Sequence, residues 1–408
     1  MNRPVGFHYD PFDATVMAKP LPYYRILRKR YPAYYMPKWD TFALSRFEDI
    51  WRVLEVNDGT FVASEGTLPA ASVLARHNTG PVGDPPLHPL PFHAVFDTDL
   101  YGEIRRAHSQ PLRPRSVAGL ADRIRTLANE RLDELLPQGS FDLTQEYGGI
   151  VAASMVCELL GLPTDLAPQV LAAVNAGSLA EPGVGVEVAE ARPNYLGFLT
   201  PVVERRRADQ SGVPGLPIVD GLIGYRLPDG SALSDVEAAT QMLCIFIGGT
   251  ETVPKIVAHG LWELSKRPDQ LAAVRADPDA NVPIAREEML RFCAPAQWFA
   301  RTARKPFTIH DQTIQPGQRI ITLLASANRD EREYEQPDEF VWNRPIKRSV
   351  VFGRGQHFCI GYHLARLEID VLLTEWLRRV PDFAIQGDAA TRLPSSFQWG
   401  WNKIPVEV

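Results

Sequence analysis

Apolar positions recur every three or four residues over much of the chain, a spacing typical of amphipathic helices. Two short segments near the N-terminus, 33–36 and 41–44, instead carry β-favouring residues around a turn and are predicted strands. The segments 307–309 and 319–322 are predicted as two further strands. The predicted helices are 116–136, 151–161, 234–266, 283–292 and 360–379. The pattern therefore predicts a mainly α fold with small β-sheets.

The predicted helix over 234–266 is exceptionally long. Ser234 is a good N-cap and Glu237 follows three residues later, which together form a capping-box pattern. At 1.5 Å per residue such a helix runs roughly 50 Å, enough to cross a whole domain. Its middle, 242–249, is apolar on every side and is expected to be buried.

Composition indicates one large folded unit. The chain has 408 residues, of which 45% are hydrophobic, so it can form a core large enough to enclose a cofactor. It shows no internal repeat, and the proline-rich stretch 80–86 is short, with helix-like sequence on both sides. A single domain over 1–408 is therefore expected.

Charge and cysteine content narrow the possible functions. The net charge of −6 argues against a nucleic-acid partner. The N-terminal residues include no apolar run that would form a signal peptide or membrane anchor. The four cysteines are widely spaced without CxxC pairs, so neither a disulfide framework nor a zinc site is expected, and a cytoplasmic location is. They are Cys157, Cys244, Cys293 and Cys359.

The most informative segment is 352–361, a glycine-rich loop that delivers Cys359 to the start of a predicted helix. The helix dipole and free backbone N–H groups at such a position favour the thiolate. Gly355 and Gly361 are expected to let the backbone pass close to a flat ligand. The alternative is a buried structural cysteine, the usual role of a lone cysteine.

The spacing of Phe352, Gly355, Cys359 and Gly361 resembles the haem-binding loop of cytochromes P450, F-x-x-G-x-x-x-C-x-G. The resemblance implies a cytochrome P450 fold with heme b (iron protoporphyrin IX) buried between the long central helix and the cysteine loop. Cys359 would then be the ligand of the iron. Thiolate ligation favours cleavage of the O–O bond.

Glu288 and Arg291 lie three residues apart, hence on one helical face. Exposed pairs of this kind contribute little, on the order of 0.3 kcal/mol, and a solvated pair is the simpler interpretation when the pattern stands alone. The flanks, however, resemble the ExxR helix and meander of the same family, with Arg344 as the third member of a Glu–Arg–Arg network. The resemblance implies a buried structural network that holds the cysteine loop.

Within the long helix, the segment 248–252 resembles the family's oxygen-binding motif [AG]-G-x-[DE]-T. Two adjacent glycines cost a helix about 1 kcal/mol each relative to alanine, so Gly248 and Gly249 indicate that a ligand or a backbone needs the space. Glu251, a carboxylate linked to bulk solvent, and the alcohol of Thr252 would deliver protons. The alternative is that Thr252 bonds back to a helix carbonyl. Pro254 removes one N–H donor and is predicted to kink the helix and widen the groove.

The resemblance also implies partners for the two porphyrin carboxylates. Arg301 occupies the family's R-x-A position, His357 stands two residues before the cysteine, and Arg105 fits an H-x-x-x-R segment. Tyr101 replaces the histidine of that segment, although tyrosine can still donate a hydrogen bond. The matches together span 97–361.

The segments that line the substrate pocket in this family are rich in aromatic residues here and carry few charges, which suits a small apolar or aromatic ligand. The C-terminal segment 397–401 also resembles that of bacterial guaiacol-type O-demethylases. The alternative is that the tryptophans only pack against the sheet. The predicted pocket residues are Phe246, Ile247, Gly248, Gln297, Trp298, Phe299, Phe397, Gln398, Trp399 and Trp401.

The resemblance implies a monooxygenase that hydroxylates or oxidatively demethylates a small organic molecule with dioxygen and two electrons. No flavin or iron–sulfur domain fits within 408 residues, so a separate ferredoxin and its reductase are expected partners. Arg348, Arg354 and Arg366 are candidate contacts for the ferredoxin on the cysteine side. A peroxide-driven peroxygenase and a non-catalytic haem sensor or carrier are the alternatives.

Overall fold

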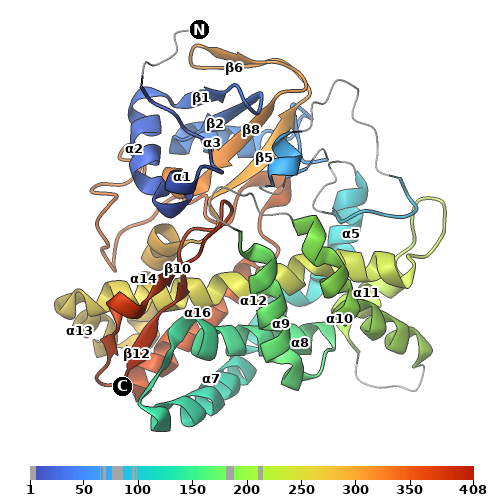
Figure 1. Ribbon diagram of the computed structural model, residues 1–408. Coiled ribbons are helices and arrows are strands. Elements are labelled where there is room, and N and C mark those ends of the chain that lie inside the picture. Colours follow the sequence, from blue (N-terminus) through green and yellow to red (C-terminus); the bar gives the residue numbers. More distant parts are fainter. Residues whose placement is uncertain are drawn as a thin grey trace.

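The computed structural model describes residues 6–64, 66–67, 70–75, 86–93, 97, 99–180, 188–209 and 215–408. A sheet-rich part built largely from the N-terminal segment lies above a larger helical part, and the long helix α12 runs along the boundary (Figure 1). The prediction of a mainly α fold with small sheets is confirmed. The predicted loop over 80–86 lies outside the described residues, apart from Pro86.

The helices have the following bounds: α1 Ala14–Ala18, α2 Pro20–Arg30, α3 Phe47–Glu55, α4 Ala71–Leu74, α5 Asp99–Ser109, α6 Pro114–Ala118, α7 Ala121–Leu135, α8 Ile150–Leu160, α9 Ala167–Ser178, α10 Val188–Ala208, α11 Pro217–Gly224, α12 Asp235–Ser265, α13 Pro268–Ala276, α14 Pro278–Cys293, α15 Leu324–Ala327 and α16 Tyr362–Arg379. A π-helix, η4, spans Leu143–Gly149.

The strands are β1 Ala33–Met36, β2 Thr41–Leu44, β3 Phe61–Val62, β4 Ser140–Asp142, β5 Trp298–Ala303, β6 Phe307–Ile309, β7 Gln312–Ile314, β8 Arg319–Leu323, β9 Ala384–Ile385, β10 Thr391–Arg392, β11 Trp401–Lys403 and β12 Pro405–Glu407.

All four predicted strands are found, and four of the five predicted helices are single elements. The fifth, predicted over 116–136, is two helices, because Gly119 and Leu120 form a turn between α6 and α7. Glycine is a weak helix former, so this break has a local cause. Helix α14 starts earlier than predicted, at Pro278, where the side chain of Asp277 accepts from the N–H of Ala280.

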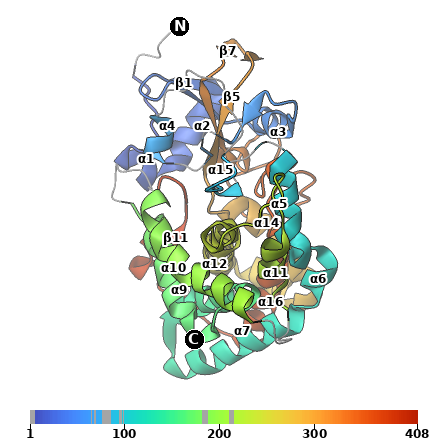
Figure 2. The ribbon, with the colours of Figure 1, turned by 90° about the vertical axis from the view of Figure 1, so that its right-hand side faces the viewer.

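Helix α12 forms the axis of the helical part. Its capping box is confirmed, since Ser234 Oγ accepts from Glu237 N at 3.3 Å and Glu237 accepts from Ser234 N at 2.7 Å. Seen end-on in Figure 2, α12 occupies the centre, with α9 and α10 on one side and α5 and α11 on the other. The helix continues through Pro254 as one element, and a bend of its axis there stays a prediction.

The main sheet has the strand order β1-β2-β8-β5-β3. Strands β1 and β2 form an antiparallel pair, whereas β2 and β8 run parallel with Thr41 opposite Arg319. One hydrophobic core lies beneath this sheet, and a second, larger core lies among the helices. Among the described residues, none of the helices combines the length and the apolar character that a membrane span requires.

Candidate functional site

Cys359 sits at the end of a tightly closed loop before α16. The N–H of Cys359 donates to the carbonyl of Phe352 at 2.9 Å, and the N–H of Phe358 donates to Gly355 O at 3.1 Å. The Phe352 ring packs edge-on against Tyr362 in the first turn of α16, with ring centres 4.9 Å apart. The loop therefore fixes the direction of the cysteine side chain before any ligand is bound.

The backbone N–H groups of Gly361 and Tyr362 lower the pKa of the Cys359 thiol, as expected at a helix N-terminus. Burial nevertheless raises the pKa of the thiol, and these donors and the charge of Arg105 oppose the shift only in part. The backbone N–H groups thus favour the thiolate as expected, but desolvation of the charged form outweighs them. A metal ion at the sulfur would supply the missing stabilisation.

The two glycines of the loop, Gly355 and Gly361, are small for different reasons. Gly355 has a φ of +72°, and a Cβ there would lie 2.3 Å from the carbonyl oxygen of Leu54 in α3. Its small size is therefore required by the neighbouring backbone as well as by its conformation. At Gly361, by contrast, the nearest atom to an added Cβ is Cys359 Sγ at 4.0 Å, so this residue leaves space beside the sulfur.

The long helix faces the cysteine loop across this space. The thiol of Cys244 in α12 lies close enough to Cys359 for their charges to interact. Burial, with a smaller contribution from Cys359, raises the pKa of Cys244 to about 12. The predicted site between the long helix and the cysteine loop thus corresponds to a real juxtaposition.

The predicted carboxylate-binding residues come together beside the loop. Arg105 donates to the hydroxyl of Tyr101 at 2.8 Å, and that hydroxyl donates to Gln356 O at 3.2 Å. The rings of Tyr101 and His357 lie 4.4 Å apart. The tyrosine that departs from the family pattern is thus part of the cluster and orients Arg105.

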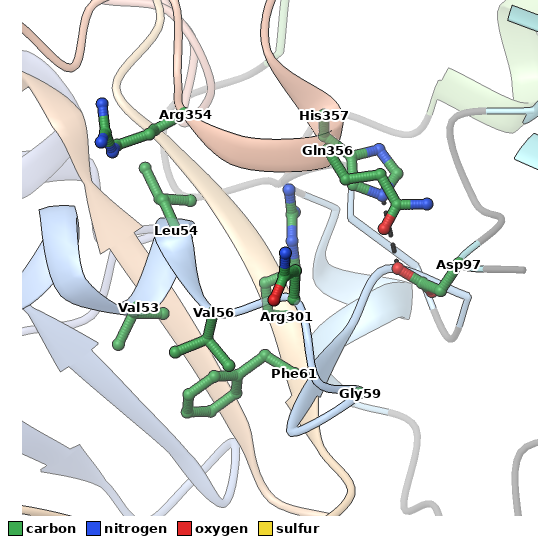
Figure 3. Close-up of a pocket in the computed structure, with 11 residues that line it drawn as sticks. Val53, Leu54, Val56, Gly59, Phe61, Asp97, Arg301, Arg354, Gln356 and His357 are labelled. Atoms are coloured by element: carbon green, nitrogen blue, oxygen red, sulfur yellow. Dashed lines mark hydrogen bonds and ion pairs between the residues drawn. The ribbon is translucent and has the colours of Figure 1, made fainter. Parts of the chain in front are cut away.

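Arg301 lines a cavity of about 50 Å³ together with His357 and Arg354 (Figure 3). Its guanidinium donates to Thr67 Oγ1 at 2.5 Å and to the Ala300 carbonyl at 2.8 Å, and burial lowers its pKa. Within the described residues, no carboxylate lies at ion-pair distance from Arg301. A buried guanidinium without an anionic partner fits a ligand that carries carboxylates.

Asp97 is a member of this cluster that was not predicted. One of its oxygens lies 3.3 Å from His357 Nε2, and the other accepts from the N–H groups of Ala63 and Ser64 at 2.7 and 2.8 Å. The Asp97–His357 contact is visible in Figure 3. Within the described residues, His357 contacts the Asp97 carboxylate, whereas neither Arg105 nor Arg301 has a carboxylate at ion-pair distance, so both arginines could bind the two propionates of a haem. The residues present fit the group.

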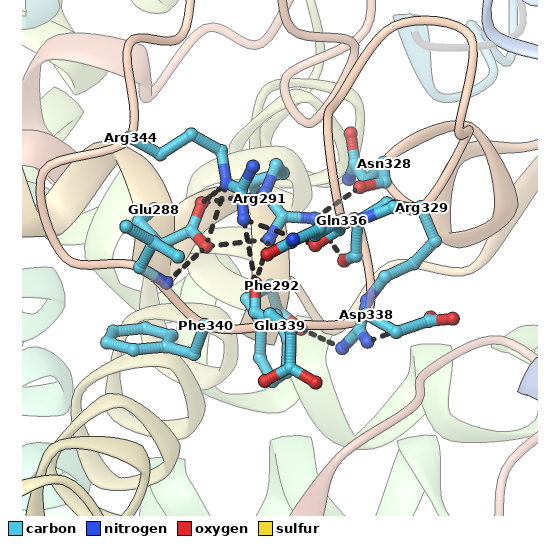
Figure 4. Close-up of polar contacts among 12 residues, drawn as sticks. Glu288, Arg291, Phe292, Asn328, Arg329, Gln336, Asp338, Glu339, Phe340 and Arg344 are labelled. Atoms are coloured by element: carbon cyan, nitrogen blue, oxygen red, sulfur yellow. Dashed lines mark hydrogen bonds and ion pairs between the residues drawn. The ribbon is translucent and has the colours of Figure 1, made fainter.

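The predicted Glu288–Arg291 pair is fully buried (Figure 4). Arg291 Nε and an Nη each donate to one carboxylate oxygen of Glu288 at 2.7 Å, a bidentate arrangement. The remaining N–H groups of Arg291 donate to three backbone carbonyls of the meander, the segment 327–340. These belong to Asn328, Pro337 and Glu339.

Arg344 completes this network, which was predicted as Glu–Arg–Arg. Its Nε lies 3.1 Å from both oxygens of Glu288, and its Nη groups reach the carbonyls of Glu335, Gln336 and Glu339. The exposed-pair interpretation is therefore excluded, since Glu288 and Arg291 are completely buried. The network fixes the segment that leads to the Cys359 loop.

The two glycines in the middle of α12 face different surroundings. A Cβ at Gly248 would meet nothing within 4 Å, whereas one at Gly249 would lie 2.7 Å from a methyl group of Val156 in α8. Gly248 thus opens into free space as predicted for an oxygen groove, but Gly249 is small because two helices pack closely there. Thr252 Oγ1 donates to the Gly248 carbonyl at 3.0 Å, which is the back-bond considered as its alternative.

Glu251 has no direct exposure to bulk solvent, so the predicted link to solvent would have to pass through other groups. Its side chain is 1% exposed. One oxygen lies 2.5 Å from Lys255 Nζ, and the other accepts from Ser178 Oγ and Gln398 Nε2, each at 2.6 Å. Lys255 also donates to Gln398 Oε1 at 2.8 Å, which closes a ring of three side chains. Sequence reasoning did not identify Lys255 or Ser178, although a lysine in an apolar helix was a usable signal.

Several predicted pocket residues instead form hydrogen bonds within or to residues 395–401, the C-terminal turn. The Gln297 amide donates to carbonyls of the turn at 3.1–3.3 Å, and its oxygen accepts from Tyr24 at 2.7 Å. Trp298 is fully buried and donates to Ser396 O at 2.9 Å. Gln398 faces Glu251. Polar groups saturated by the protein are not free to bind a substrate.

The tryptophans of the C-terminal turn are packed, as the alternative had it, but against helix α12 and not only against the sheet. Trp399 packs near His259 of α12, with ring centres 5.6 Å apart, and Trp401 packs on Trp262 at 4.3 Å. Phe246 is buried against Tyr195 and Phe198 of α10. Two other predicted pocket residues, Phe299 and Phe397, are partly exposed and lie edge to face at 5.6 Å, and Ile247 is partly exposed.

The three arginines considered for ferredoxin contact are all paired within the chain. Arg348 binds Glu48 and Glu333 at 2.9 and 2.5 Å. Arg354 binds Glu55 at 2.5 Å, and Arg366 binds Glu287 at 2.7 Å. Their positive charge is therefore largely compensated at the surface.

Fold and site together define a class of protein. A partly buried cysteine at a helix N-terminus faces a long central helix, a basic cluster flanks the space between them, and a buried Glu–Arg–Arg network supports the loop. This is the arrangement of a thiolate-ligated haem protein.

Comparisons with known proteins give the family. The family model described as Cytochrome P450 matches residues 187–386. A putative cytochrome P450 123 of Mycobacterium tuberculosis is 30% identical over 406 residues, covering 98% of this chain and 96% of that protein. The chain belongs to the cytochrome P450 family, which implies a haem-binding monooxygenase.

Other relatives agree over nearly the whole length. Cytochrome P450 CYP199A2 of Rhodopseudomonas palustris is 28% identical, covering 98% of this chain and 93% of that protein. The solved structure of cytochrome P450 CYP109Q5 from Chondromyces apiculatus has a TM-score of 0.80 and 27% identity, covering 98% and 97% of the two chains. A mutant of P450 EryK, solved with erythromycin B, has a TM-score of 0.82 and 25% identity, covering 97% of each chain.

Proposed function

We propose that this cytochrome P450 hydroxylates or oxidatively demethylates a small apolar molecule, with an aromatic ring as the preferred group. Phe299 and Phe397 carry the proposal for the substrate. They are the predicted pocket residues whose rings are partly exposed and contact each other, whereas the polar candidates beside them are saturated. Aromatic side chains of this kind suit flat apolar ligands.

Cys359 would hold the haem iron, and Arg105, Arg301 and His357 would bind the propionates, with Tyr101 orienting Arg105. When bound, the thiolate-ligated haem supplies activation of dioxygen. The space beside Gly248 would admit the oxygen molecule.

Thr252 would hold a proton at its hydroxyl above this space and accept a replacement through water from Glu251. Its bond to the Gly248 carbonyl orients that hydroxyl. We further propose that a separate ferredoxin, reduced by its reductase, supplies electrons on the face that carries the partly exposed Phe358.

The decisive experiment is an absorbance titration of the haem protein with benzoates, methoxyphenols, terpenes and short fatty acids. A change from low to high spin with the aromatic compounds, followed by dioxygen-dependent product with a ferredoxin system, supports the proposal. Turnover with peroxide alone favours a peroxygenase, and tight ligand binding without any turnover favours a sensor or carrier. Cys359→Ala serves as the control, since it should abolish the red-shifted band of the reduced carbon monoxide complex.

A further inference from the structure

The side chains around Glu251 bear on how this buried acid regains a proton after passing one to Thr252. The pair of Glu251 and Thr252 does not by itself supply that replacement. Among the residues that the structure describes, three side chains contact its carboxylate: Lys255 on one oxygen, and Ser178 and Gln398 on the other. Since Glu251 is buried, any proton that it passes on has to be replaced through one of these partners or by movement of the whole side chain.

The chemistry of the three partners differs. An amide N–H, as in Gln398, does not release its proton under ordinary conditions. The Lys255 ammonium has donors but no lone pair. Among the described residues, its one hydrogen-bond partner besides Glu251 is Gln398 Oε1, an acceptor that holds no proton. A hydroxyl is donor and acceptor at once, so Ser178 can give its proton to Glu251 while it takes another from the opposite side.

The position of Ser178 fits such a role. It is the last residue of α9, which packs against α12 (Figures 1 and 2). Ser178 is buried, whereas the next residue, Leu179, is 41% exposed. The chain thus reaches the protein surface one residue after Ser178.

We propose that Ser178 is the proton-entry residue for Glu251, and that Lys255 and Gln398 are positioning residues that turn the carboxylate toward it. In the step, the Ser178 O–H bond breaks as its proton moves to Glu251 Oε2, and a hydronium ion of the solvent donates a proton that forms a new O–H bond on Ser178 and leaves water behind. No electrons are transferred. The inference rests on the proposed function, because protons are consumed only if dioxygen is reduced.

Tyr195 of α10 is the strongest rival on this side of the carboxylate. Glu251 contributes to the raised pKa of Tyr195, about 12, although burial is the larger cause, so the two groups are near each other. No hydrogen bond joins them within the described part of the chain, whereas Ser178 is in direct contact at 2.6 Å.

The test compares Ser178→Ala and the conservative Ser178→Thr in the haem-loaded enzyme. It uses the compound of the panel that gives the largest spin-state change. Ser265→Ala is the matched control, because it removes a hydroxyl at the end of α12 that donates to Trp262 O and lies far from Glu251 in the sequence. The readouts are product formed per NADH, the solvent isotope effect on product formation, and the infrared carboxylate bands, assigned to Glu251 by their loss in Glu251→Gln. The infrared readout does not depend on turnover.

For Ser178→Ala we expect product per NADH to fall about tenfold, less than the roughly 10²-fold effect of losing a direct general acid. The solvent isotope effect should rise and the Glu251 band should shift, while Ser178→Thr restores all three and Ser265→Ala changes none. If Ser178→Ala keeps normal coupling and isotope effect, the inference is wrong. If Tyr195→Phe instead gives these effects, the proton enters through α10. A wild-type enzyme that forms no dioxygen-dependent product would overturn the proposed function itself.

Discussion

Glu288 and Glu251 are both buried carboxylates that face a cation about one helical turn further along the same helix, yet their surroundings differ. Glu288 pairs with Arg291 three residues on, and Glu251 pairs with Lys255 four residues on. All four side chains are at most 2% exposed. The difference lies in what else each pair contacts.

Around Glu288, the carboxylate and both arginines are fully engaged in hydrogen bonds with fixed partners. Arg291 uses its five N–H groups on the carboxylate and on three carbonyls, and Arg344 binds the same carboxylate from the other side. A planar guanidinium cannot be deprotonated in a protein and holds its partners in one geometry. The Glu288–Arg291–Arg344 network is therefore suited to fixing the backbone around it and not to transferring a proton.

Around Glu251, the cation is a lysine, and the contacts include a hydroxyl. Burial lowers the pKa of the Lys255 ammonium, and Glu251 opposes this shift. Ser178 adds a group that can exchange protons. The comparison teaches that the same acid–cation spacing on a helix supports either rigid structure or proton traffic, depending on the remaining neighbours.

Glu368 in α16 shows what burial does to a carboxyl group without such a partner. Within the described residues it makes no ion pair or hydrogen bond, and burial raises its pKa to about 8. The effect of substitutions on stability can therefore be compared between Glu368, a buried acid without such a partner, and the paired acids Glu251 and Glu288.

The largest effect is expected from Arg291→Met. It leaves Glu288 with Arg344 and the Val341 N–H but removes the bidentate partner and the links to the meander. Removing one member of a buried ion pair costs about 3–5 kcal/mol, so urea unfolding should show a loss of this size together with loss of bound haem. A loss below about 1 kcal/mol would contradict the assigned role of the network.

The second effect concerns Glu368 and pH. Because its folded-state pKa is raised, the folded protein binds a proton that the unfolded chain releases between about pH 4.5 and 8. Stability should therefore fall as the pH rises through this window. Relative to Glu368→Gln, wild type should lose on the order of 3 kcal/mol between pH 5 and 8 in urea titrations. Parallel pH profiles for the two proteins would show that this acid does not titrate as described.

Lys255→Met removes the cation of the Glu251–Lys255 pair. It should lower the free energy of unfolding less than Arg291→Met does. Glu251 keeps Ser178 and Gln398 as donors, so we expect a loss of about 2 kcal/mol in the free energy of unfolding. Adding Glu251→Gln should recover part of this loss, because the double variant buries no unpaired charge. Lys266→Met, which removes an exposed lysine at the end of α12, is the matched control. Equal losses at positions 255 and 291 would remove the distinction between the two networks.

Thr252→Ala should have the smallest effect on folding and a large one on chemistry. It removes one back-bond to a carbonyl that stays within the helix, so the free energy of unfolding should change by less than about 1 kcal/mol. Product formed per NADH should fall at least about tenfold, with peroxide released in place of product. Unchanged coupling would show that this hydroxyl plays no part in proton delivery.

Much of the fold could be predicted because its signals are local. The strands β1 and β2, the long helix α12 and its capping box depend on residues close together in the sequence. The break between α6 and α7 was missed although Gly119 marks it, because one glycine within an apolar pattern is tolerated in many helices.

The haem side of the site was also accessible from sequence. Cys359 lies on a short loop with fixed glycine spacing, and Glu288 and Arg291 are brought together by one helical turn. The predicted carboxylate-binding residues meet in one cluster, although the contribution of Asp97 was not foreseen.

The sequence by itself determined which helix carries the acid and alcohol, which cysteine faces it and which Glu–Arg pair supports the loop, since each depends on periodicity or spacing within about ten residues. Only the tertiary structure decided what surrounds the acid. Ser178 and Gln398 lie 73 and 147 residues from Glu251 and reach it because α9 and the C-terminal turn pack on α12. Burial and hydrogen bonds from distant segments set the environment of a side chain, and no local pattern encodes them.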